Sequence, residues 1–150
     1  MIPESRLIRS ELTIRELSLP DDVLLARKSL IRWLALSLGM ILPNESRRLL
    51  LDILEAVFEA HVKGDAPTTK DIMDRLKTLT KEEPNAKAVY YHLLRLKELG
   101  LLSRKKGRYY LCEGEGKKLK EIVRGFYLRK ADGAFSNIDK ALEKLESGYR

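Results

Sequence analysis

The chain has little of several residue types on which catalytic and metal-binding sites depend. Its 150 residues include one cysteine, Cys112, and two histidines, His61 and His92. One cysteine cannot form an internal disulfide, and so few cysteines and histidines exclude a cysteine-rich metal site and a zinc motif. The sequence also offers no paired nucleophile and base and no glycine-rich phosphate loop, so we expect no enzymatic activity and no cofactor.

Glutamine is absent and asparagine occurs only three times, whereas lysine, arginine and glutamate abound. Depletion of heat-labile amides is typical of heat-adapted proteins, which predicts a thermophilic source. The N-terminus shows no apolar signal segment, and charged residues interrupt the long apolar stretch at residues 22–40. We therefore expect a cytoplasmic protein with no membrane partner.

Positive charge is concentrated in residues 86–112. This stretch holds seven basic residues against one acid, Glu98, and so carries +6 of the chain's net charge of +7. Concentrated positive charge on a short unit is typical of proteins that bind a phosphate backbone.

The spacing of apolar residues predicts a mainly helical chain with one small β-hairpin. Residues 1–20 are either a short strand or an extended arm that ends at Pro20. Helices are expected over residues 22–40, 45–63, 68–79, 86–99 and 117–131, and a last helix capped by Ser136 after an interruption at Asp132-Gly133.

Local signals define the boundaries of the central helices. Thr68 and Asp71 form an acidic variant of the capping box, and Asn85 is the expected N-cap of helix 86–99. Gly100 stands where a helix-ending glycine belongs. The runs 101–104 and 108–112, joined by Lys105-Lys106-Gly107, predict a hairpin.

The predicted helix 22–40 is apolar on two sides. One stripe suits the chain's own core, and the second suits another subunit because a helix that is apolar nearly all round must be buried. We therefore expect a homodimer, with the second stripe at the interface: Leu25, Trp33, Leu36 and Met40.

Three helices followed by a hairpin is the element order of a winged helix-turn-helix. We expect that domain at residues 45–115, between an N-terminal arm and dimerisation helix at 1–44 and a helical extension at 116–150. The run Ala88–Leu102, with its Leu-Gly-Leu exit at residues 99–101, resembles the recognition helix of ArsR-like and PadR-like winged-helix regulators. Residues 108–111 followed by Gly116-Lys117-Lys118 also resemble the second wing strand and the next helix of those families.

This resemblance implies a dimeric transcriptional regulator with helix 86–99 in the major groove and the hairpin tip beside the DNA backbone. Tyr90 either packs against helix 68–79 or joins the contact. The cysteine pairs and histidine–acid clusters of ArsR-type metal sensors are missing, and no residue marks an effector site. The expected DNA-contacting residues are Thr68, Thr69, Lys70, Lys87, Tyr90, Tyr91, Arg95, Lys105, Lys106 and Arg108.

Two residues depart from an ideal DNA-reading helix. Leu94 is apolar and Glu98 is acidic on the outward face, and Leu94 touches either a thymine methyl or another protein. The first hypothesis is therefore sequence-specific binding of double-stranded DNA. The alternative is a winged-helix protein-interaction module of a larger complex. RNA binding is the weaker third possibility because the aromatic motifs of RNA-binding folds are missing.

Overall fold

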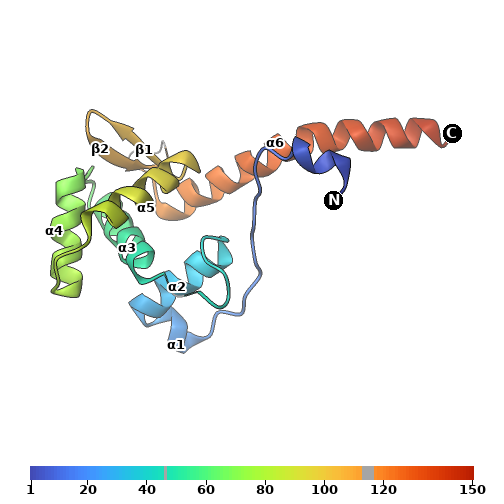
Figure 1. The fold of residues 1–150 in the computed structure, drawn as a ribbon. Coiled ribbons are helices and arrows are strands. Elements are labelled where there is room, and N and C mark those ends of the chain that lie inside the picture. The colour runs from blue at the N-terminus through green and yellow to red at the C-terminus, as the bar shows by residue number, and fades with distance from the viewer. Residues whose placement is uncertain (46, 113–116) are drawn as a thin grey trace. The chain divides into compact units, whose positions relative to one another are not determined.

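The computed structural model describes residues 1–45, 47–112 and 117–150. They form a mainly helical chain with one two-stranded antiparallel hairpin (Figure 1). The elements are η1 (Pro3–Leu7, a 3₁₀ helix), α1 (Asp21–Leu24), α2 (Arg27–Ser37), α3 (Arg48–Val62), α4 (Thr69–Thr80), α5 (Ala86–Glu98), β1 (Leu102–Lys105), β2 (Arg108–Leu111) and α6 (Leu119–Gly148).

The chain divides into two compact units. One comprises Met1–Asn44 together with Arg129–Arg150, and the other is Glu45–Leu128. The second unit extends past the boundary expected at residue 115, because the first part of α6 belongs to it.

The core of Glu45–Leu128 is built where α3, α4 and α5 pack together and the hairpin packs on α3 and α5. Helical spacing turns one face of each helix inward, and strand alternation does the same for β2, where Tyr109 and Leu111 are buried and Arg108 is exposed. The largest fully buried side chains are Ile53, Ile72, Leu76, Val89, Leu93, Leu101 and Leu111.

The predicted N-caps of α4 and α5 are confirmed, and the ends of both helices differ from the expected residues by one position. Thr68 and Asp71 form a reciprocal capping box, and the Asn85 side chain accepts a hydrogen bond from the Ala88 N–H at 3.1 Å. After α5, Gly100 takes φ +84° and the Leu101 N–H donates to the Leu96 carbonyl at 3.0 Å. This bond satisfies a carbonyl that the helix end would otherwise leave without a partner.

The predicted hairpin is also confirmed, and its turn is tighter than the three residues expected. Lys105 pairs directly with Arg108, so only Lys106 and Gly107 form the turn. Their φ values are +51° and +79°, and positive φ at both positions defines a type I′ turn, whose twist matches that of the strands.

The continuous helix expected over residues 22–40 is wrong. Ala26 has the extended values φ −108° and ψ 110°, which separate α1 from α2, and α2 ends at Ser37. Gly39 then takes φ +73°, where a Cβ would lie 2.5 Å from that of Thr13. Leu25 therefore lies in the break and Met40 lies beyond the helix, so the four residues of the second stripe do not form one helical face.

Residues 1–20 contain the 3₁₀ helix η1 and then an extended arm; among the described residues only the hairpin strands pair with each other. The arm is fixed by Arg15, whose guanidinium donates to the carbonyls of Leu36 and Ile41 at 2.6 and 3.0 Å. The Trp33 indole N–H donates to the Ser18 carbonyl at 2.8 Å.

The interruption expected at Asp132-Gly133, with a new helix capped by Ser136, is also wrong. α6 runs unbroken from Leu119 to Gly148. A single glycine costs a helix only about 1 kcal/mol relative to alanine, and the alanines on either side of this pair favour helix. No helix in the described part of the chain is long and apolar enough to cross a membrane.

Candidate nucleic-acid interface

Helix α5 turns one face into the core and the other toward solvent. Val89, Leu93 and Leu96 are buried at 0 %, 1 % and 3 % exposure and hold the helix against α3 and α4. The outward face carries the exposed side chains of Lys87, Tyr90, Tyr91, Leu94, Arg95 and Glu98.

The expected contact residues of α5 are therefore all at the surface. Tyr90 is 54 % exposed, which leaves its ring available for a partner. The Arg95 guanidinium donates to the Tyr91 hydroxyl at 3.3 Å and lies 5.9 Å from the centre of the Tyr91 ring. This link joins the two side chains across one helical turn.

His92 borders the inward face of the same helix. It is half-buried, and burial lowers its pKa, with the positive charges of Arg47 and Arg95 acting in the same direction. Each of these effects disfavours the charged imidazolium, so His92 is neutral at pH 7 and adds no charge to the outward face.

The hairpin exposes a second group of cations. Arg104, Lys105, Lys106 and Arg108 are exposed, and three of them were expected at the contact. Arg104 was not assigned a role from the sequence. It lies opposite Tyr109 in the ladder, with its guanidinium 5.3 Å from the ring centre. Cross-strand pairing is the signal that predicts such an arrangement once the hairpin register is known.

The start of α4 lies against the hairpin. The Tyr109 N–H donates to the Pro67 carbonyl at 2.8 Å, and Thr68 forms an isolated antiparallel bridge with Arg108. The Arg108 guanidinium also donates to the Ala66 carbonyl at 2.8 Å. The sequence does not reveal this isolated bridge, which brings the expected contacts of α4 and of the hairpin together within one unit.

The three residues expected at the start of α4 are placed differently from one another. Lys70 is exposed. The Thr68 hydroxyl accepts from the Asp71 N–H at 3.1 Å, so it caps the helix. Thr69 is 9 % exposed and its hydroxyl is buried, so its side chain offers no accessible donor, and the contact expected through its backbone N–H stays a prediction. Lys70 is the remaining side chain here that can reach a phosphate.

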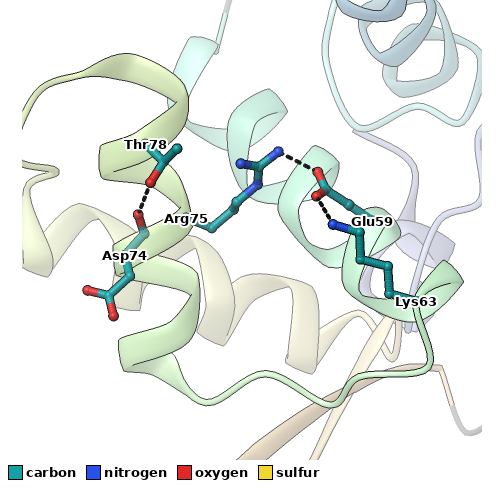
Figure 2. Close-up of polar contacts among 5 residues, drawn as sticks. All are labelled: Glu59, Lys63, Asp74, Arg75 and Thr78. Carbon is teal, nitrogen blue, oxygen red and sulfur yellow. Dashed lines mark hydrogen bonds and ion pairs between the residues drawn. The ribbon is translucent and has the colours of Figure 1, made fainter.

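Elsewhere in the same unit, cations are neutralised by acids. Figure 2 shows Glu59 of α3 accepting from Lys63 at 2.8 Å and from Arg75 of α4 at 2.7 Å. These two hydrogen bonds lower the pKa of Glu59, and the bond from Lys63 has the larger effect. Glu59, Arg75 and Arg108 also line a cleft of about 390 Å³ beside the start of α4.

In the part of the chain that the structure describes, the outward cations of α5 and the hairpin form no such ion pairs. The pKa of the Asp71 carboxylate is lowered first by its hydrogen bonds with Thr68, and Arg108 and Lys70 lie near enough to lower it further. Within the described ranges, no carboxylate forms an ion pair with any of Lys70, Lys87, Arg95, Lys97, Arg104, Lys105, Lys106 and Arg108. Exposed positive charge without an internal counter-charge attracts external anions.

The remaining expectations from the sequence concern a metal site, Cys112 and Gly116. The described residues contain no group of three or more histidine, cysteine, aspartate or glutamate side chains able to hold a metal ion. Cys112 is buried at 3 % exposure directly after β2. Gly116 lies outside the described residues.

No protein-family model, curated protein or solved structure matches this chain.

Proposed function

We propose that residues 45–128 form a winged helix-turn-helix domain that binds double-stranded DNA, and that the protein acts as a homodimeric transcriptional regulator. The observation that carries the proposal is the exposed positive charge on α5 and on the hairpin, whose cations form no ion pair with a carboxylate of the described residues. In such a domain, α5 enters the major groove and the hairpin follows the backbone.

The arrangement of the elements supports the proposal. α3, α4 and α5 pack together, and the hairpin follows α5 directly (Figure 1). The isolated bridge between Thr68 and Arg108 joins the start of α4 to the hairpin. Because α5 is anchored by Val89 and Leu93, its outward side chains are held on a rigid element, as base readout requires.

The outward side chains divide by role. Lys87 and Arg95 are the base-reading candidates, since lysine and arginine donate to guanine O6 and N7. Lys105 at the end of β1 and Lys106 in the turn contact phosphate, which positions the domain without reading sequence.

The test is fluorescence anisotropy with duplexes of different sequence. Lys87→Ala or Arg95→Ala should narrow the difference in affinity between a selected duplex and a mixed-sequence duplex. Lys105→Ala with Lys106→Ala should weaken binding to both equally. Ser147→Ala, exposed on α6, is the control and should change neither. Absence of DNA binding by the unmodified protein at low salt would contradict the proposal.

A second candidate function is supported by the apolar part of the same face. Leu94 is 53 % exposed and Tyr90 is 54 % exposed, so α5 also offers an apolar surface to another protein. A winged-helix interaction module would use this surface, and Leu94→Ala would then weaken binding of the partner protein.

A further inference from the structure

The second half of α6 has an exposed row of large apolar side chains. Every residue of the helix from Asp132 onward is exposed. A helical segment of this length without packing partners is marginal in water, and Gly133 weakens it further. The exposed fractions in the row are 53 % for Leu128, 51 % for Phe135, 44 % for Ile138, 57 % for Leu142 and 51 % for Leu145.

The row follows a seven-residue repeat. Its members are separated alternately by four and three residues once the half-buried Ala131 is included. In heptad notation the a positions are Leu128, Phe135 and Leu142, and the d positions are Ala131, Ile138 and Leu145. A repeat of 3.5 residues per turn keeps apolar side chains on one seam, which is the pattern of a two-stranded coiled coil.

The side chains that flank the seam determine the orientation of a partner helix. The e positions are all acidic: Asp132, Asp139 and Glu146. The g positions are all small: Ala134, Ala141 and Gly148. In an antiparallel pair of identical helices, e faces e, which would bring the acids of the two copies together. In a parallel pair, e faces g, so each acid meets a small neutral residue and no like charges are opposed.

We propose that α6, from Leu128 to Leu145, forms a parallel two-stranded coiled coil with α6 of a second copy of this chain. The seam is about 26 Å long at 1.5 Å per residue. A second copy of the chain is the partner because, in the parallel orientation, the apolar seams of the two copies face each other and no like charges are opposed. The inference deepens the dimeric part of the proposed function and replaces the stripe of helix 22–40 as the interface.

Sedimentation equilibrium of the full chain tests the oligomeric state. Leu142→Glu should raise the dimer dissociation constant at least about 100-fold, because each copy loses a buried leucine and brings an unpaired carboxylate into the seam. Ser147→Glu adds the same charge at an exposed f position and should leave the constant nearly unchanged. Gly133→Ala, also at an f position with open space around it, should tighten the dimer by favouring helix.

Disulfide formation tests the orientation. In a Cys112→Ser background, Leu142→Cys should crosslink two copies rapidly, because equal a positions face each other only in the parallel pair. A dimer that does not crosslink at residue 142 would overturn the parallel arrangement. Two results would overturn the interface itself. One is a monomeric wild-type protein, which is expected if the chain's own arm covers the row. The other is a dimer whose dissociation constant does not change with Leu142→Glu.

Anisotropy on the same variants separates this inference from the proposed function. If the coiled coil forms and DNA does not bind, the dimer stands and the DNA-binding proposal fails. If DNA binds and the wild-type protein is monomeric, the DNA-binding proposal stands and the coiled coil fails.

Discussion

The hairpin turn allows two positive charges to be removed without disturbing the fold. Lys105 and Lys106 are exposed and form no ion pair with any carboxylate in the described residues. Lys106 has φ +51° and precedes Gly107, and asparagine followed by glycine is a favoured pair for a type I′ turn. Lys105→Ala combined with Lys106→Asn therefore removes both charges and keeps the turn.

The expected effect follows from counterion release. The logarithm of the binding constant falls with the logarithm of salt concentration by about 0.9 for each phosphate neutralised. Two lysines in each copy make four in a dimer, so the slope should become shallower by about 3.6 if each lysine contacts one phosphate. When salt rises from 50 to 200 mM, the factor by which the wild type loses affinity should be roughly 100 times larger than the factor by which the variant does.

The assay is fluorescence anisotropy of a labelled duplex over that range of salt. The control is Lys140→Ala with Lys144→Ala, which removes the same charge from exposed, unpaired positions of α6 outside the apolar seam. An unchanged slope in the hairpin variant would remove the hairpin from the interface. An equal change in both variants would mean that net charge, and not local contact, determines binding.

Four further predictions concern stability and the packing of the arm. Thr68→Ala should lower the free energy of unfolding by about 1 kcal/mol in urea titrations, because the capping bond to the first turn of α4 is lost. The Thr68 N–H donates to the Asp71 carboxylate and lowers the pKa of Asp71 below the usual 3.8. The stabilisation that this bond gives the folded protein is therefore complete above pH 3.8 and is lost as the pH falls through the pKa of Asp71 in the folded state. Asp71→Asn should therefore flatten the loss of stability measured below pH 4. Leu93→Ala should lower the free energy of unfolding by about 2–5 kcal/mol, since the side chain is 1 % exposed and leaves a cavity; a smaller loss would mean that α5 is loosely packed. Gly39→Ala should speed proteolysis in the arm around Thr13, because the new Cβ would collide with that residue, and an unchanged cleavage rate would contradict the observed contact.

The central elements could be predicted because their boundaries are set by local chemistry. A capping threonine, a capping asparagine, a helix-ending glycine and a turn glycine each act through hydrogen bonds or backbone freedom within a few residues. The same is true of the outward face of α5, because the helical period alone decides which side chains are opposite Val89 and Leu93.

The predictions from the sequence were wrong where longer-range packing decides the structure. No glycine or proline marks the break at Ala26. The extended arm contacts the following residues through Arg15 and Trp33, and these contacts are not visible in a periodic pattern. The break expected at Gly133 is absent from α6, since one unfavourable residue does not end a helix whose neighbours favour it. Dividing α6 at that point also concealed its seven-residue repeat.

The most direct test of the central claim is the affinity of the wild-type protein for a mixed-sequence DNA duplex across a salt titration. We predict sub-micromolar binding at low salt and a steep fall as salt increases, because the exposed cations of α5 and the hairpin form no ion pair with a carboxylate of the described residues. No binding at low salt, or binding that does not depend on salt, would contradict the claim.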